Sequence, residues 1–182
     1  MADKYPAGAE WWNRVSGLAG KILGKADEPK PDADAGEPQA LTVEQRKAQA
    51  LDVLRNLVAG GKGNAALTLY HKTVEVCERW ELPEKELLHF TELLCNEKLW
   101  NGAVPFLENY LERFEKRVIP VRLRLAKILI EQQQRPSYAA RILAELPRQG
   151  LSEKEQKIRS SLEQKAQKMI DDGVLELEGR AW

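Results

Sequence analysis

Cysteine and histidine are scarce in this chain of 182 residues, which contains two of each. Cys77 and Cys95 are too few for the disulfide framework of a small secreted domain, and both lie among apolar residues, so we expect buried, reduced thiols. His71 and His89 have no second histidine or paired cysteine at the spacing of metal ligands. The sequence therefore predicts neither a disulfide scaffold nor a metal centre.

An excess of charge of one sign is also lacking. The chain has 28 Lys and Arg residues against 28 Asp and Glu residues, with a sequence pI near 6.8. Proteins that bind nucleic acid usually carry a basic excess or a basic stripe, so this balance argues against a nucleic-acid partner. No run approaches the roughly 18 consecutive apolar residues of a membrane-spanning helix. The first residues, MADKYPAGAEWW, do not have the pattern of a signal peptide. We expect a cytoplasmic protein with, at most, peripheral contact with a membrane surface.

Recognisable catalytic motifs are missing as well. The glycines of residues 17–21 and 60–63 have neither the spacing of a phosphate-binding loop nor a preceding strand. Cys77 and His71 lie six residues apart, so on one helix they point to different faces and form no local nucleophile and base pair. The sequence therefore predicts a protein that is not an enzyme and has no cofactor.

An acidic segment with several prolines divides the chain. Between Asp27 and Ala40 there are five acidic residues against one lysine, and the segment has few apolar side chains. Such a segment cannot bury enough apolar surface to offset the entropy cost of ordering, so we expect a disordered linker over residues 27–41. The linker separates an N-terminal segment, residues 1–26, from a helical domain of residues 42–172. Residues 173–182 form a C-terminal tail.

Helical patterns fill the domain of residues 42–172. Apolar residues recur at intervals of three and four, and two capping boxes, Thr42 with Gln45 and Ser152 with Glu155, predict the starts of the first and last helices. No β-hairpin signal occurs before Gly173, so the fold class is all-α. The expected starting points of the intervening helices are Asn64, Pro83, Asn101, Pro120 and Pro136.

The predicted helices repeat in pairs. Alignment of NAALTLY, NGAVPFL and SYAARIL places Ala66, Ala103 and Ala139 in register, at intervals of 37 and 36 residues. The preceding helices align as Ala50, Leu87 and Leu123, then Val53, Phe90 and Ala126, then Leu57, Leu94 and Ile130. A small residue lets two helices approach closely, and stacking buries the face that one pair leaves exposed. We expect a solenoid of about three antiparallel helix hairpins plus a C-terminal helix, with an irregular helical bundle as the alternative.

On these residues, with AALTLY and GAVPFL as the best-matched segments, residues 42–150 resemble the tetratricopeptide-repeat family. The chain departs from the family in the middle of the first helices, where Leu54, Thr91 and Lys127 stand in place of a small residue. The resemblance implies a non-catalytic adaptor or scaffold that binds a protein or peptide on a concave face formed by the first helices. Carried over by position, that face comprises Leu51, Arg55, Val58, Leu88, Glu92, Asn96, Arg124, Ile128 and Glu131. Its mixed charge favours a peptide or helix with apolar and charged positions over an RNA ligand.

A second candidate docking element lies in the N-terminal segment, within AEWWNRVSGLAGKILGK, residues 9–25. On a helical wheel, apolar residues form one continuous face with basic residues along one flank. Three uses remain open: a groove on a partner protein, the chain's own helical domain, and weak contact with an anionic membrane surface. The last use would make the protein a peripheral membrane-associated component, which is the alternative function. The proposed anchors of this docking helix are Trp11, Trp12, Val15, Leu18 and Ile22.

The tail, DDGVLELEGRAW, alternates apolar and acidic residues and ends at Trp182. Alternation is typical of a strand, but the rest of the chain offers no sheet for it to join. Packing on the last helix, pairing with a partner's strand and a loose tail all remain open.

Overall fold

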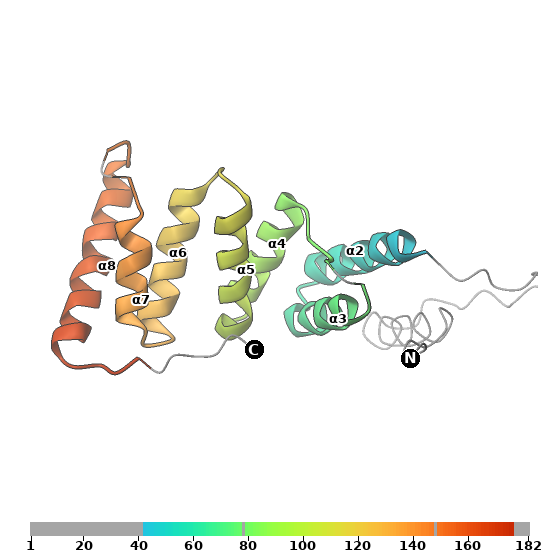
Figure 1. Cartoon of the computed structure of the whole chain (residues 1–182), viewed down its shortest axis with the longest axis horizontal. Coiled ribbons are helices and arrows are strands. Elements are labelled where there is room, and N and C mark those ends of the chain that lie inside the picture. The colour runs from blue at the N-terminus through green and yellow to red at the C-terminus, as the bar shows by residue number, and fades with distance from the viewer. Residues whose placement is uncertain (1–41, 78, 148, 177–182) are drawn as a thin grey trace, which may run out of the picture. The chain divides into compact units, whose positions relative to one another are not determined.

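The computed structural model describes residues 42–77, 79–147 and 149–176, and every regular element among them is an α-helix. The all-α fold class is therefore confirmed. The predicted docking helix, the acidic linker and Trp182 lie outside the described residues. In chain order the helices are α2 (Val43–Ala59), α3 (Gly63–Val76), α4 (Glu84–Asn96), α5 (Trp100–Arg113), α6 (Val118–Glu131), α7 (Pro136–Ala144) and α8 (Glu153–Asp171) (Figure 1).

The chain divides into two compact units, Met1–Glu86 and Leu87–Trp182, and the boundary falls in the first turn of α4. In the first unit, α2 packs against α3. Trp80 follows α3 and stacks on Tyr70, with 5.4 Å between the ring centroids. The buried residues of these two helices are Ala50, Leu54, Leu57, Gly63, Ala66, Leu69 and Thr73.

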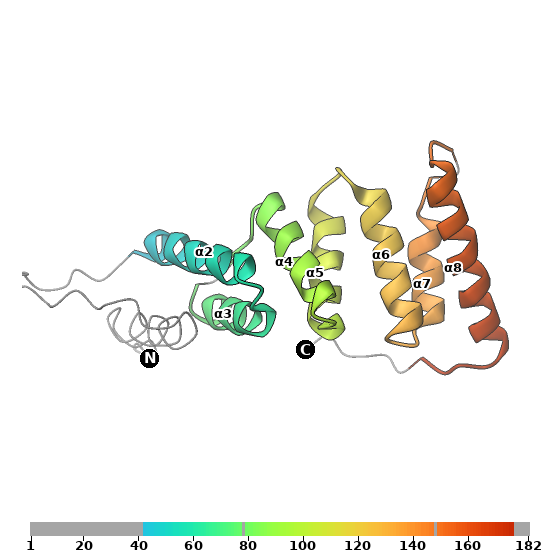
Figure 2. The same ribbon diagram turned by 180° about the vertical axis from the view of Figure 1, so that it is seen from behind.

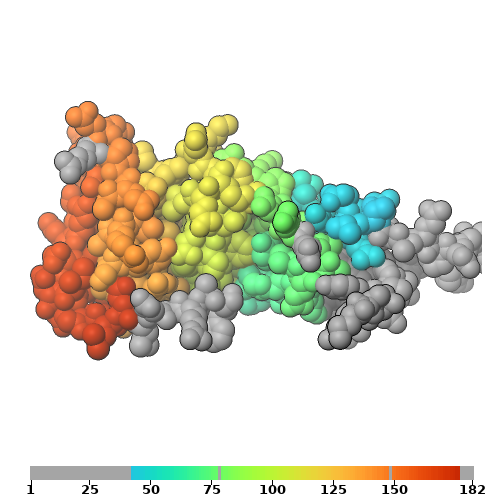
Figure 3. All heavy atoms as spheres, in the orientation of Figure 1, coloured from blue at the N-terminus to red at the C-terminus, as the bar shows by residue number. Residues whose placement is uncertain are grey.

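In the second unit, α6 packs against α5, α7 and α8, and α7 also packs against α8 (Figures 1 and 2). Side chains fill the spaces between neighbouring helices of this unit (Figure 3). Phe90 of α4 contacts Phe106 of α5, with ring centroids 4.9 Å apart. Seven of the 14 residues of α6 are buried, so α6 contributes more to the core of this unit than any other helix.

Two of the helix starts follow the predicted capping chemistry. Thr42 Oγ1 accepts a hydrogen bond from Gln45 N at 3.2 Å, and Gln45 Oε1 accepts one from Thr42 N at 2.9 Å. Ser152 and Glu155 form the same box at α8. The prediction that Asn64 caps the second helix is wrong, because α3 already begins at Gly63 and its N-cap, Lys62, makes no side-chain capping bond.

Each turn between the two helices of a hairpin contains a residue with a left-handed backbone. Gly61, Lys98 and Gln134 all adopt left-handed backbone conformations, with φ of 65°, 59° and 52°. The second helix begins two residues later in every case, at Gly63, Trp100 and Pro136. The left-handed residue and the start of the second helix therefore recur at the predicted intervals of 37 and 36 residues. Ala66, Ala103 and Ala139, the alanines that define the repeat, are all completely buried.

The predicted register of the first helices needs one correction. After α2, Lys62 N donates to Leu57 O at 3.0 Å, and after α4, Leu99 N donates to Leu94 O at 2.8 Å. After α6 the corresponding bond runs from Arg135 N to Leu129 O, also at 2.8 Å, and spans one residue more. The α6–α7 turn thus contains one extra residue, and Leu129 rather than Ile130 matches Leu57 and Leu94.

This shift changes which residue lies in the middle of α6, the first helix of the third hairpin. With the corrected register, Ala126 rather than Lys127 aligns with Leu54 and Thr91, and all three aligned positions are buried. The Thr91 hydroxyl donates to Leu87 O at 2.6 Å, so the buried polar group is satisfied within its own helix. In α6 this buried position is therefore occupied by a small residue, Ala126.

Candidate partner-binding surface

In the second unit, the solvent-exposed side of α4 and α6 carries polar and charged residues. We call this set the first-helix surface. With the corrected register, Lys127 matches Arg55 and Glu92, and its neighbour Ile128 is buried and contributes to packing instead. The members of the first-helix surface are Glu92 and Asn96 of α4 and Arg124, Lys127 and Glu131 of α6, and all five are exposed.

Glu131 is largely neutralised by neighbouring lysines. Its Oε1 lies 2.8 Å from Lys165 Nζ of α8, and its Oε2 lies 3.9 Å from Lys127 Nζ one helical turn earlier. The ion pair with Lys165 connects α6 to α8. The carboxylate of Glu131 therefore adds little net charge to the first-helix surface.

Glu92 and Arg124 are not neutralised in the same way, since neither forms an ion pair within the described part of the chain. Both charges act on the thiol of Cys95, which places them near one another. Burial raises the pKa of Cys95, while the charge of Arg124 acts in the opposite direction. Burial is also the main cause that raises the pKa of Cys77. Raised pKa values keep both thiols protonated, which is the state of a structural cysteine rather than a nucleophile.

The candidate residues of the first unit behave differently. Arg55 is held by Glu86, whose Oε1 lies 2.6 Å from Nη2, and by Asp52 at 3.1 Å from Nη1. The hydrogen bond to Glu86 raises the pKa of Arg55. Leu51 and Val58 are half-buried. Arg55 is thus engaged within its own unit, although the sequence assigned it to partner binding.

The remaining candidates lie in α4 and in the N-terminal segment. Leu88 of α4 is half-buried, and it is the one apolar candidate in the second unit that retains exposed surface. The anchors of the N-terminal docking helix, Trp11, Trp12, Val15, Leu18 and Ile22, lie outside the described residues.

Sequence reasoning missed a cluster around Tyr138 in α7. The guanidinium carbons of Arg135 and Arg141 lie 4.7 and 5.1 Å from the centre of its ring. The hydroxyl donates to Glu108 Oε1 of α5 at 2.9 Å. Burial is the largest cause and this hydrogen bond the second, and together they raise the pKa of Tyr138 to about 12. The arginines stand three residues before and after the tyrosine, so the spacing R-x-x-Y-x-x-R was the available signal.

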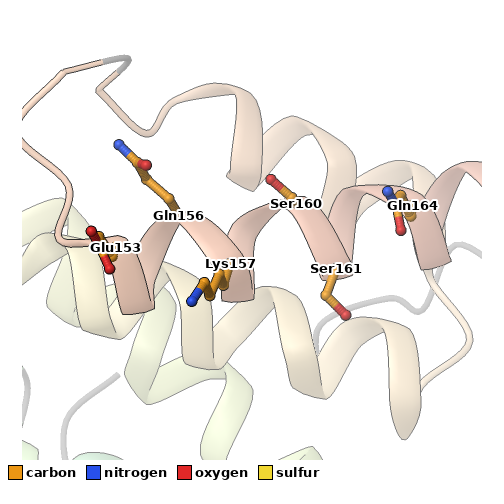
Figure 4. A pocket seen from close by; sticks show the side chains of 6 residues that line it. All are labelled: Glu153, Gln156, Lys157, Ser160, Ser161 and Gln164. Atoms are coloured by element: carbon orange, nitrogen blue, oxygen red, sulfur yellow. The ribbon is translucent and has the colours of Figure 1, made fainter.

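A polar hollow lies along α8, and Figure 4 shows that its side chains all come from that helix. Leu162 and Ala166, the buried residues of α8, do not belong to it. The hollow offers little apolar surface for another hairpin to pack against. Its lining residues in the described part of the chain are Glu153, Gln156, Lys157, Ser160, Ser161 and Gln164.

Within the described residues, no cluster of three or more histidine, cysteine, aspartate or glutamate side chains could hold a metal ion. None of the helices described here combines the length and the apolar character that crossing a membrane requires. Comparisons of the chain with protein-family models, curated proteins and solved structures find no match.

Proposed function

We propose that this protein is a non-catalytic interaction scaffold built from tetratricopeptide-like hairpins, and that the first-helix surface binds a peptide or helix of a protein partner. One observation carries the proposal. Three hairpins share a left-handed turn residue and a buried alanine, while the first-helix surface of α4 and α6 exposes polar and charged side chains. Stacked helical repeats create the extended surfaces on which helical-repeat proteins bind their partners.

The charges of the first-helix surface indicate what the partner carries. Arg124 and Lys127 lie one turn apart on α6, and within the described residues the ion pair of Lys127 is the long 3.9 Å contact with Glu131. An acidic side chain of the partner would complement these two cations, and a basic one would complement Glu92. Such complementarity mainly sets specificity and the rate of association. Half-buried Leu88 adds an apolar contact beside the charges.

A differential pull-down with mass spectrometry tests the proposal. The triple variant Glu92→Arg, Arg124→Glu, Lys127→Glu changes the net charge by −2, and Lys157→Glu on α8 changes it by the same amount outside the surface. We expect a partner that binds the wild type and Lys157→Glu but not the triple variant. A synthetic peptide from that partner should bind the triple variant at least about tenfold more weakly by fluorescence anisotropy, which corresponds to about 1.4 kcal/mol. A partner retained by the triple variant would overturn the assignment of this surface.

A further inference from the structure

Helix α8 is attached to its neighbours by little apolar burial. Of its 19 residues only Leu162 and Ala166 are buried, whereas seven of the 14 residues of α6 are buried. Local stability follows the amount of apolar surface that an element buries, so an element with few buried side chains opens at a lower free energy than the core. By this measure α8 is the least secured long helix of the second unit.

Polar contacts add only modest attachment along the length of α8. Lys165 Nζ lies 2.8 Å from Glu131 Oε1 of α6, but both side chains are partly exposed. Near the start of α8, Arg159 Nη1 donates to Pro147 O at 3.3 Å. Ion pairs in contact with water contribute little to stability, so these contacts do not replace the missing apolar burial.

The tail provides a further attachment at the far end of α8. Gly173 has φ of 75°, and the amides of Gly173 and Val174 donate to Ile170 O and Met169 O at 3.0 Å each. These two bonds form a Schellman-type helix ending, which reverses the direction of the chain. The tail then runs from the end of α8 to the start of α7 (Figure 1).

At the start of α7, Glu176 of the tail takes the role of a capping residue. Its carboxylate accepts hydrogen bonds from the amides of Ser137 and, at 3.4 Å, of Tyr138. Arg135, the N-cap of α7, makes no side-chain capping bond, and Pro136 has no amide hydrogen to donate. A carboxylate at a helix N-terminus satisfies unpaired amides and interacts favourably with the helix dipole. The tail thus stabilises α7 while it holds the end of α8 in place.

We propose that α8 and the tail residues up to Glu176 form a hinged lid over the α6–α7 hairpin, with Glu176 as its latch. When the carboxylate leaves the start of α7, the lid opens without unfolding α5 or α6, and the apolar surface that Leu162 and Ala166 cover becomes accessible. Opening would also break the ion pair between Lys165 of α8 and Glu131 of the first-helix surface. The lid does not depend on the proposed function.

Amide hydrogen exchange on the full chain tests the lid. The variants are Glu176→Gln, which removes the charge of the latch, and Glu112→Gln, a matched change on an exposed residue of α5 without a hydrogen bond or ion pair in the described structure. In Glu176→Gln we expect amides of α8 and of the first turn of α7 to exchange about tenfold faster, the effect of one lost hydrogen bond. Amides of α6 should keep the wild-type rate, and Glu112→Gln should match the wild type throughout.

Three results would overturn the lid. Unchanged exchange in Glu176→Gln would show that Glu176 latches nothing. Faster exchange at Ser137 and Tyr138 alone would show a helix cap without a lid. An equal acceleration of α6 and α8 would show that α8 opens only with the whole unit.

Discussion

Arg55 of α2 donates two hydrogen bonds to the same carboxylate oxygen of Glu86, from Nε at 3.0 Å and from Nη2 at 2.6 Å. The two residues are 31 positions apart, and the pair joins α2 to the first turn of α4 within the first unit. Asp52 holds the remaining arm of the guanidinium at 3.1 Å. Arg55 therefore contributes to the stability of its own unit through these contacts.

The Arg55–Glu86 pair predicts a dependence of stability on pH. Burial alone would raise the pKa of Glu86, but the hydrogen bond from Arg55 and the charges of Arg55 and Lys85 outweigh it, so the pKa lies below the ordinary value of 4.5. A carboxylate with a lowered pKa stabilises the fold above its ordinary pKa, and this contribution disappears as the pH falls through the lower, folded value. Urea unfolding should show Glu86→Gln less stable than the wild type at pH 7, with a smaller difference at pH 3. Glu75→Gln, an exposed change in α3, should show no difference at either pH.

The buried alanines predict a steep cost for larger side chains. Ala139 of α7 is completely buried, and Ala144 on the same helix is exposed. Because a packed interface cannot accept three extra carbon atoms without moving, Ala139→Leu should lower the free energy of unfolding by about 1–3 kcal/mol or more. Ala144→Leu should change it by less than about 0.5 kcal/mol. Equal effects in chemical denaturation would contradict the close approach of α7 to its neighbours.

The repeated turn predicts two stabilising substitutions. Lys98 and Gln134 adopt the left-handed conformation that Gly61 adopts in the first hairpin. A side chain makes that conformation costly, by roughly 1–2 kcal/mol, and glycine removes the cost at the expense of a more flexible unfolded chain. Lys98→Gly and Gln134→Gly should each raise the free energy of unfolding by up to about 1 kcal/mol. Lys116→Gly, at an exposed position without a left-handed backbone, should lower the free energy of unfolding. Thermal melting measures the direction of each change, and a lower melting temperature for Lys98→Gly or Gln134→Gly would contradict the prediction.

Tyr138 should ionise later than an ordinary tyrosine. Its pKa is raised from 10.0 to about 12, first by burial and then by the hydrogen bond to Glu108. Since the unfolded chain loses this proton at lower pH than the folded chain, stability should fall as the pH rises from about 10 toward 12. The difference between the ultraviolet titrations of the wild type and Tyr138→Phe isolates this group. A midpoint near pH 10 in the difference curve would show that Glu108 and the surrounding residues do not hold the proton.

The N-terminal docking helix remains a prediction from the sequence. If residues 9–25 attach to an anionic membrane surface, then Trp11→Ala with Trp12→Ala should reduce co-sedimentation with phosphatidylserine vesicles several-fold. Asn13→Ala with Ser16→Ala, a double change of uncharged residues outside the apolar face, serves as the control. Negligible sedimentation of all three proteins would discard the membrane alternative. A groove on a partner protein and the chain's own helical domain would then remain as targets of the tryptophans.

The sequence by itself determined the helices, two of their caps and the repeat. Thr42 with Gln45, and Ser152 with Glu155, cap their helices through bonds across three residues, so nearby residue types suffice to predict them. Ala66, Ala103 and Ala139 could be aligned because the second helices recur at nearly constant intervals. Burial then confirmed what the periodicity of apolar residues had indicated.

Only the tertiary structure decided the register of α6 and the partners of the charged residues. One extra residue in the α6–α7 turn moves Lys127 onto the exposed side and Ile128 into the core, and a polar turn leaves no apolar pattern from which to count it. Glu86 as the partner of Arg55, and Glu176 as the cap of α7, depend on segments 31 and 39 residues apart that meet only after folding. Interactions within a helical turn are determined by residues that are neighbours in the sequence. Contacts between distant segments depend on packing and loop length as well.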